Sequence, residues 1–193
     1  METDSEAVEL VDAEFVRPFA RAALLAALTG AFAYVSFPLP LSPVPVTLQV
    51  FGVFLAGLYL GPKWGAVSMV LYLAAGAVGA PIFSGGTAGI GVLLAERGGY
   101  LWAFPLAAFL IGLVVHRGVR IRNPADASVP LVVAALLAGA VLIYALGVAW
   151  LSWVLAIGVV EAIAIGALPF VPGELFKIAA AIAIVKSGAI DPT

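Results

Sequence analysis

Six long apolar segments, separated by short polar or Pro/Gly-rich breaks, dominate the pattern of the sequence. They run from 19 to 37, 46 to 60, 64 to 80, 99 to 116, 130 to 150 and 172 to 186. A helix needs about 20 predominantly apolar residues to cross a bilayer. The pattern therefore predicts an all-α integral membrane protein with six transmembrane helices. The stretch 151–167 is also apolar but contains Glu161 and two glycines, so it either extends the fifth helix or lies at the membrane interface.

Composition supports a membrane domain and argues against several kinds of site. Of the 193 residues, 64% are hydrophobic and 10% are charged, whereas soluble domains contain about 25% charged residues. The absence of cysteine and the single histidine argue against disulfides and against zinc or haem chemistry. We expect one six-helix domain over residues 18–190. Residues 1–17 form an acidic tail before it, which carries six carboxylates and lacks the basic region of a signal peptide.

The distribution of lysine and arginine predicts the orientation of the helices. On the side opposite the two termini, the only basic residues are Arg97 and, inside the sixth helix, Lys177. Because basic loops remain in the cytoplasm, we expect both termini there, in a multi-pass protein of the cell membrane. The Pro-rich break 38–45, the Gly-rich break 81–91 and the start of the sixth helix then share the outer side, which we identify as the binding face. The basic residues on the side of the termini are Arg17, Arg21, Lys63, Arg117, Arg120, Arg122 and Lys186.

The most informative polar residues are Glu174 and Lys177, at the start of the sixth segment. Pro172 and Gly173 mark a helix start, and residues three apart share one side of a helix. One charge inside a bilayer costs about 2.5–3.5 kcal/mol on insertion scales, so the pair needs a reason to be there. A carboxylate ligand held by Lys177 beside free backbone N–H groups supplies one. An internal ion pair, or a lysine extending to the membrane interface, is the alternative.

Other polar or conformationally unusual residues are expected on the same outer side. Arg97 adjoins the Gly-rich break and either reaches the pocket or lies at the interface beside Glu96. Thr47 and Gln49 need hydrogen-bond partners from a ligand or from a neighbouring helix. The Gly-rich break either lines a cavity or forms an external loop. The candidate ligand-binding residues are Lys177, Glu174, Arg97, Tyr100, Ser84, Gly85, Gly86, Thr47, Gln49 and Tyr144.

The first segment carries small residues four positions apart, a spacing that lets helices approach closely. This pattern serves either packing inside the chain or docking of another membrane subunit. The candidate docking residues are Ala22, Ala23, Ala26, Ala27 and Ala31.

Several short motifs, in order and at suitable separations, resemble the BioY family, the biotin-binding S components of energy-coupling factor (ECF) transporters. They are PVPVTLQ at 43–49, LYLGP at 58–62, LYL at 71–73, PIF at 81–83, GGY at 98–100 and PFVPG at 169–173 followed by Lys177. The resemblance spans residues 19–187. It departs from the family at Glu174, where an aspartate is expected, so the charge is kept and the side chain is one methylene longer.

The resemblance implies the ECF S-component fold and high-affinity capture and uptake of biotin near the outer surface. It also implies a transmembrane coupling subunit and two cytoplasmic ATPases as partners, with the small-residue face of the first helix docking on the coupling subunit. Within the site, it implies that Glu174, Lys177 and the Gly-rich break contribute, with Arg97 as a further polar contact. We expect no cofactor, metal or nucleic-acid partner.

An ion- or proton-coupled secondary carrier for a small anionic vitamin is the alternative function, with Glu174 or Glu161 as the proton site. An enzyme is not expected. The chain has no nucleotide-binding loop, and a serine–histidine pair would have to use His116, at the cytoplasmic edge and far from Ser84.

Overall fold

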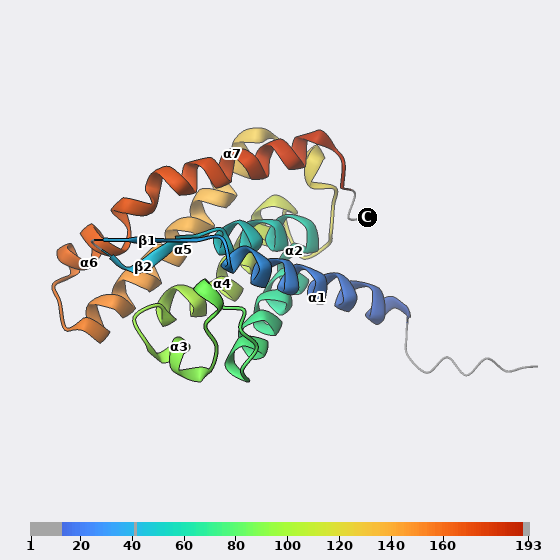
Figure 1. Cartoon of the computed structure of the whole chain (residues 1–193). Helices are drawn as coiled ribbons and strands as arrows, with labels where there is room; N and C mark the ends of the chain where they lie inside the picture. The colour runs from blue at the N-terminus through green and yellow to red at the C-terminus, as the bar shows by residue number, and fades with distance from the viewer. Residues whose placement is uncertain (1–12, 41, 191–193) are drawn as a thin grey trace, which may run out of the picture.

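The computed structural model describes residues 13–40 and 42–190 as a mainly helical molecule (Figure 1). Most of the predicted acidic tail, residues 1–12, lies outside the described residues. The long helices are α1 (Ala13–Ala33), α2 (Gln49–Ala77), α4 (Gly98–Val115), α5 (Val129–Leu155) and α7 (Val171–Ser187). In the described part of the chain, five helical stretches are long and apolar enough to cross a membrane. The start of α1 and the end of α7 lie on the same side of the molecule, on the right of Figure 1. Helix α6 lies on the opposite side.

The long helix α2 contains both the second and the third predicted segments. Its 29 residues are interrupted at Gly61, whose φ of 69° and ψ of −173° are not helical. Glycine reaches this backbone conformation without the steric cost that a Cβ atom would bring. Pro62 follows and provides no N–H for the helix. The interruption predicted between segments 46–60 and 64–80 is therefore a sharp break inside one long helical element.

His116, at the end of α4, stabilises this break. The missing N–H of Pro62 deprives the carbonyl of Leu58, four residues earlier, of its helical partner. His116 Nε2 lies 3.0 Å from that carbonyl oxygen, and the Arg122 backbone N–H donates to His116 Nδ1 over 3.0 Å. Since Nδ1 accepts, Nε2 carries the proton and donates. The sequence suggested an interfacial residue, but the ring is buried, with 1% of its surface exposed.

An antiparallel hairpin follows α1 and was not predicted. Strand β1 (Ser36–Leu39) pairs with β2 (Ser42–Thr47), with Ser36 opposite Thr47. The prolines of the Pro-rich break lie within these strands or in the turn. Each strand of a two-stranded hairpin has an unpaired edge, and proline is tolerated there because no backbone N–H has to donate to a neighbouring strand. The fold is thus mostly helical but not purely so, and β2 leads directly into α2.

The Gly-rich break and the stretch before α7 also contain short elements. A 3₁₀ turn, η1 (Ser84–Gly86), and the short helix α3 (Ile90–Leu94) lie between α2 and α4. The 3₁₀ turn η2 (Pro124–Asp126) lies between α4 and α5. After α5, the apolar stretch forms a separate helix, α6 (Val159–Gly166), and the 3₁₀ turn η3 (Leu168–Phe170). The sequence left open whether 151–167 extends the fifth helix. Helix α5 stops at Leu155, and the remainder folds back so that Gly166 at the end of α6 lies against Leu151 of α5.

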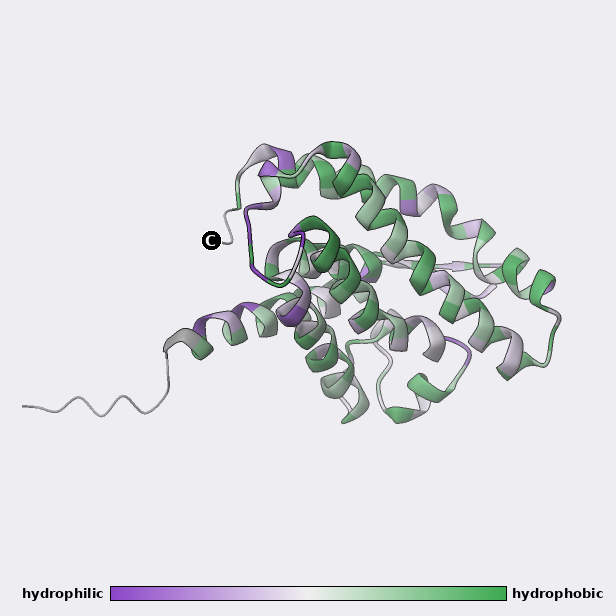
Figure 2. Cartoon of the chain, turned by 180° about the vertical axis from the view of Figure 1, so that it is seen from behind, coloured by the Kyte–Doolittle hydropathy of each residue, from purple (hydrophilic) through white to green (hydrophobic). Residues whose placement is uncertain are grey.

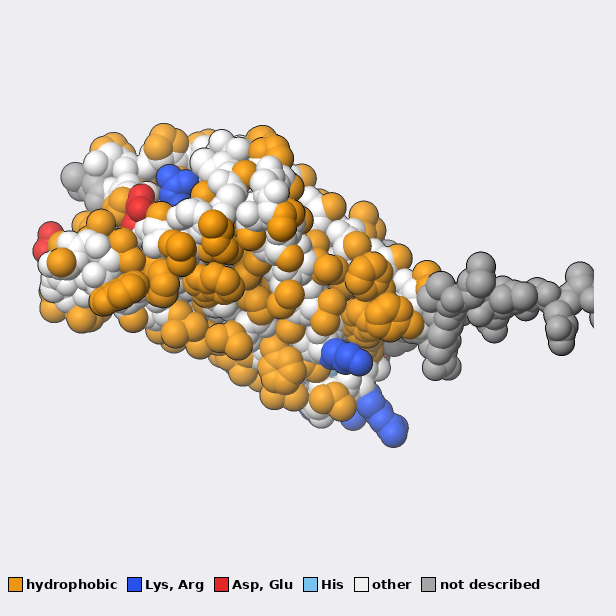
Figure 3. Space-filling view, turned by 90° about the horizontal axis from the view of Figure 1, so that it is seen from below, with side chains coloured by type: hydrophobic (Ala, Val, Ile, Leu, Met, Phe, Trp, Pro, Cys, Tyr) orange, Lys and Arg blue, Asp and Glu red, His pale blue; other side chains and the backbone are white. Residues whose placement is uncertain are grey.

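Close packing at glycines joins the helices. A Cβ on Gly52 would lie 2.3 Å from Thr29 Oγ1 of α1, and a Cβ on Gly57 would lie 2.8 Å from the Ala108 carbonyl of α4. Large apolar side chains remain exposed on the outside of the helices. Hydrophobic residues cover most of the ribbon in Figure 2, and few charges interrupt the apolar face in Figure 3. Lipid is the solvent that suits such a surface.

We expect His116→Ala to destabilise the protein by about 1–3 kcal/mol, because it leaves the buried Leu58 carbonyl unpaired. Burial lowers the pKa of His116. The unfolded chain therefore takes up a proton near pH 6.5 that the folded chain binds only at lower pH, so the stabilisation is present above about pH 6.5 and is lost as the pH falls below it.

Thermal unfolding in detergent between pH 5 and pH 8 measures both effects. The midpoint of the wild-type chain should fall at acid pH, and this fall should be smaller for His116→Ala. Asn123→Ala, in the same connection, is the control and should keep the wild-type pH response. An identical pH response of His116→Ala and wild type would contradict the assignment.

Candidate functional site

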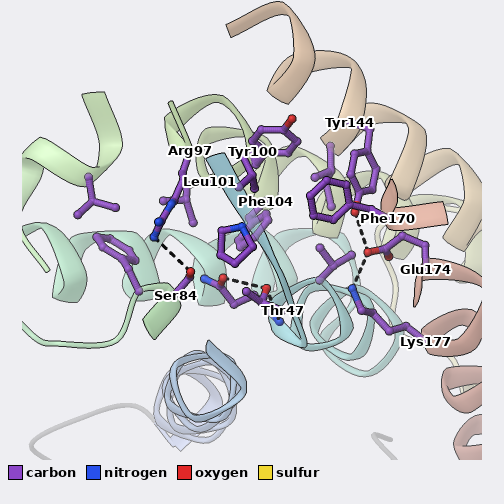
Figure 4. Close-up of a pocket in the computed structure, with 17 residues that line it drawn as sticks. Thr47, Ser84, Arg97, Tyr100, Leu101, Phe104, Tyr144, Phe170, Glu174 and Lys177 are labelled. Atoms are coloured by element: carbon purple, nitrogen blue, oxygen red, sulfur yellow. Dashed lines mark hydrogen bonds and ion pairs between the residues drawn. The ribbon is translucent and has the colours of Figure 1, made fainter. Parts of the chain in front are cut away.

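A partly open cavity lies between the β1–β2 hairpin, the start of α2, the α2–α4 connection, α4, α5 and the start of α7 (Figure 4). Its unfilled space measures about 550 Å³, open mouth included. The wall is largely apolar and aromatic, and polar side chains occupy separate parts of it. The lining residues are Val44, Pro45, Thr47, Gln49, Val50, Phe83, Ser84, Val92, Arg97, Tyr100, Leu101, Phe104, Ile143, Tyr144, Phe170, Glu174 and Lys177.

A buried ion pair occupies one part of the cavity. Lys177 Nζ lies 2.5 Å from Glu174 Oε1, and the side chains of both residues are at most 7% exposed. The Tyr144 hydroxyl of α5 donates to the same oxygen over 2.8 Å. Pro172 lies in the first turn of α7, so Glu174 is close to the partial positive charge of the helix N-terminus. Three interactions therefore stabilise one carboxylate oxygen in apolar surroundings.

The other carboxylate oxygen, Glu174 Oε2, is buried and has no hydrogen-bond partner among the described residues. Leaving a buried charged acceptor unpaired costs free energy. Lys177 likewise uses one of its three N–H donors, since Glu174 is its only hydrogen-bond partner among those residues. The pair, which belongs to the cavity wall, therefore has an unused acceptor and unused donors.

Arg97 and Ser84 form a second polar group, apart from the ion pair in Figure 4. Arg97 Nη1 donates to Ser84 Oγ over 3.3 Å. The loop carrying Ser84 turns through Gly85 and Gly86, whose φ values of 70° and 75° favour glycine. Arg97 immediately precedes α4, and its side chain makes no capping hydrogen bond to that helix.

Two tryptophans hold the corner before Arg97. The Trp102 indole N–H of α4 donates to the Leu93 carbonyl over 3.0 Å, and that of Trp150 of α5 donates to the Ala95 carbonyl over 2.9 Å. Both carbonyls lie where α3 ends, and that of Ala95 also accepts from the Gly98 backbone N–H over 2.9 Å. The position of Arg97 at the cavity is therefore defined by α4 and α5.

Thr47 and Gln49 lie where β2 meets α2. The Thr47 hydroxyl donates to Gln49 Oε1 over 3.0 Å, and Gln49 Nε2 donates to the Tyr72 hydroxyl over 2.5 Å. Gln49 is 4% exposed. Its side chain is hydrogen-bonded to Thr47 and Tyr72. The chain itself therefore supplies hydrogen-bond partners for Gln49.

Eight of the ten candidate ligand-binding residues line the cavity; Gly85 and Gly86 do not. Gly85 is exposed and Gly86 packs under Tyr34, so these two glycines shape the turn. The Tyr100 hydroxyl donates to the Gly166 carbonyl, which leaves its ring as the surface toward the cavity. Sequence reasoning missed the apolar wall, including Phe83, Phe104 and Phe170. Phe83, within the PIF motif, and Phe170, within the PFVPG motif, carried a signal. Phe104 carried none, because apolar residues occur everywhere in this chain.

The candidate docking alanines of α1 fall on two faces. Ala22 is fully buried against α2, where the Ser68 hydroxyl donates to its carbonyl over 2.8 Å. Ala26 is 7% exposed. Ala23, Ala27 and Ala31 are exposed. Ala22 and Ala26 are therefore buried within the chain and Ala23, Ala27 and Ala31 lie outward, because a four-residue spacing fits two neighbouring stripes of the same helix.

A groove runs beside the outward stripe. It is lined by α1, by the part of α2 after Gly61 and by the loop after α2. Its small residues leave the backbones accessible to close approach. The lining residues are Phe19, Ala23, Ala26, Ala27, Leu71, Tyr72, Ala75, Ala80 and Ile82.

Comparison with known proteins gives consistent relatives. The BioY family model matches residues 3–190. The chain is 40% identical to the probable biotin transporter BioY of Pyrococcus horikoshii over 85% of this chain and 91% of the relative. It is 38% identical to the biotin transporter BioY of Thermotoga maritima over 86% and 92% of the two chains.

A solved structure has the same fold. The S-component for biotin from an ECF-type ABC transporter, a crystal structure at 2.1 Å, superposes with a TM-score of 0.81 at 27% identity, covering 92% of this chain and 93% of that one. Family match, relatives and structure agree over nearly the whole length. The chain described here is a member of the BioY family.

Proposed function

We propose that this protein captures biotin in the cavity and serves as the substrate-specific membrane subunit of an ECF transporter. The observation that carries the proposal is the buried Lys177–Glu174 pair, which has unused hydrogen-bonding atoms at the wall of a largely apolar cavity. Membership of a family whose relatives are named biotin transporters supports it. The protein then acts as a transport subunit, and ATP is hydrolysed by its partners.

The chemistry of biotin matches the cavity. Biotin has an apolar bicycle with a thioether, a ureido group and a valerate carboxylate. Phe83, Phe104 and Phe170 provide apolar surface for the bicycle. Glu174 Oε2 accepts from a ureido N–H, and a free donor of Lys177 or Arg97 binds a carboxylate or carbonyl oxygen through a charge-assisted hydrogen bond. Such a ligand would satisfy the buried polar atoms that the chain leaves unpaired.

We infer six membrane crossings with both termini in the cytoplasm. As one straight helix, α2 would be about 44 Å long, more than the bilayer core of about 30 Å. The break at Gly61, where Gly65 comes close to the Ala56 carbonyl, supports two shorter crossings in place of one long one. The start of α1 and the end of α7 lie at one end of the molecule (Figure 1), and the positive-inside rule assigns that end to the cytoplasm. The cavity then opens toward the outer face of the cell membrane.

We propose that a transmembrane coupling subunit docks along the α1–α2 groove and connects the chain to two cytoplasmic ATPases. The similarity to an S-component of an ECF-type ABC transporter supports partners of this kind. Ala23 and Ala27, exposed along the groove, allow a partner helix to approach closely.

Replacing Lys177 by methionine should weaken biotin binding by about 1.5–3 kcal/mol, the net value of a hydrogen bond to a charged group. Equilibrium binding to the detergent-purified protein measures the loss. Since removing one member of a buried pair is itself destabilising, the doubly neutral variant Lys177→Met/Glu174→Gln tests binding in a chain without an unpaired charge. Lys186→Met, in the last turn of the same helix, should bind normally. Wild-type affinity of both Lys177 variants would contradict the proposed site.

Replacing Ala23 and Ala27 by leucine should abolish association with the coupling subunit and leave biotin affinity unchanged, because the added side chains fill the groove and not the cavity. Co-purification of the two subunits measures association. The control carries leucine at Ala134 and Ala145, two exposed alanines of α5, and should associate normally. Intact co-purification of the α1 variant would exclude this docking face.

A further inference from the structure

A chain of hydrogen bonds leads from the cavity wall into the protein interior. The Thr47 hydroxyl donates to Gln49 Oε1, and Gln49 Nε2 donates to the Tyr72 hydroxyl. The Tyr72 hydroxyl donates in turn to the backbone carbonyl of Ile82 over 2.9 Å. Thr47 and Gln49 line the cavity, whereas Tyr72 lies behind them and is fully buried.

The direction of this chain is determined by its last member. A backbone carbonyl has no proton and only accepts, so the single Tyr72 proton is used on Ile82. The Tyr72 oxygen is then left to accept, and an amide offers a donor only through its nitrogen. Gln49 Nε2 must therefore face Tyr72, and Oε1 must face Thr47, whose hydroxyl donates to it.

The position of Tyr72 is itself tightly defined. Its ring packs edge-to-face against Phe83, with 5.5 Å between centroids, and is stacked on Phe104 at 6.3 Å. Ile82 is held as well, because its N–H donates to the Ala80 carbonyl over 2.8 Å. Reversing the Gln49 amide would set its carbonyl oxygen against an oxygen of Tyr72 that has no proton to offer.

We propose that Tyr72 is a positioning residue that determines the substrate selectivity of the cavity by fixing the orientation of the Gln49 amide. This inference rests on the proposed function, since it assumes that biotin occupies the cavity. In the fixed orientation Gln49 has one N–H, on Nε2, and one lone pair, on Oε1, left for a ligand, and they cannot exchange places. An analogue of biotin that carries a donor in place of an acceptor, at the group that contacts Gln49, therefore loses its hydrogen bond to the amide.

The test compares biotin with two analogues in wild type and Tyr72→Phe, which keeps the ring and removes the hydroxyl. In 2-iminobiotin the ureido oxygen acceptor is replaced by a nitrogen donor, and in biotin amide a carboxylate oxygen is replaced by an NH₂ group. The measured quantity is the ratio of each analogue's dissociation constant to that of biotin. In Tyr72→Phe the Gln49 amide is free to turn, so the ratio for at least one analogue should fall by about fivefold to tenfold, the order expected for one hydrogen bond.

A merely structural role of Tyr72 would weaken all three ligands by a similar factor and leave both ratios unchanged. Tyr34→Phe is the matched control. The Tyr34 hydroxyl donates to the neighbouring Pro81 carbonyl over 2.6 Å, but Tyr34 does not line the cavity. Its ratios should equal those of wild type.

The outcomes separate this inference from the proposed function. Absence of saturable biotin binding to the wild-type chain would overturn both. Wild-type binding with unchanged ratios in Tyr72→Phe would overturn the role of Tyr72 alone. If Tyr72→Phe does not purify as a folded protein, Gln49→Met removes the amide and keeps Tyr72; it should lower the same ratio, and an unchanged ratio would again overturn the inference.

Discussion

The contact between Lys177 and Glu174 is the interaction around which the cavity is built. Two charges removed from water are costly, and a buried pair is weak support for stability by itself. Here the N-terminus of α7 favours the carboxylate, and Tyr144 brings a hydrogen bond from α5. These contacts stabilise one oxygen of Glu174 and leave the other buried and unpaired. The pair is therefore incomplete as a structural element and well suited to a polar ligand.

A second principle explains how irregular backbone is tolerated at membrane depth. Lipid offers no hydrogen bonds, so each freed carbonyl requires a donor from the protein. At several helix ends and breaks among the described residues, a long side chain donates to a backbone carbonyl. The donors and acceptors are Tyr34 to Pro81, Tyr72 to Ile82, Trp102 to Leu93, Trp150 to Ala95, Tyr100 to Gly166 and His116 to Leu58. The same breaks shape the cavity wall, so fold and site share these contacts.

The sequence predicted those features that depend on the length of its apolar segments and on the few charged residues within them. Helices α4, α5 and α7 appear close to their predicted limits, whereas α1 spans Ala13–Ala33 and the end of the predicted segment 19–37 lies in β1. Lys177 and Glu174 were identified because polar atoms are expensive in an apolar helix. The hairpin of residues 36–47 was not predicted, because prolines between apolar segments indicate a break without specifying strand pairing. The sequence could not distinguish the buried Ala22 from the exposed Ala23, since alanines on adjacent stripes carry no polarity that distinguishes lipid from protein. Tyr72 gained its importance only through contacts with residues distant in sequence.

The most direct test of the central claim is equilibrium binding of labelled biotin to the detergent-purified chain, with unlabelled vitamins as competitors. The account predicts one saturable site from which unlabelled biotin displaces the label and unrelated vitamins do not. No saturable binding by a folded, monodisperse preparation, or equal displacement by unrelated vitamins, would contradict it.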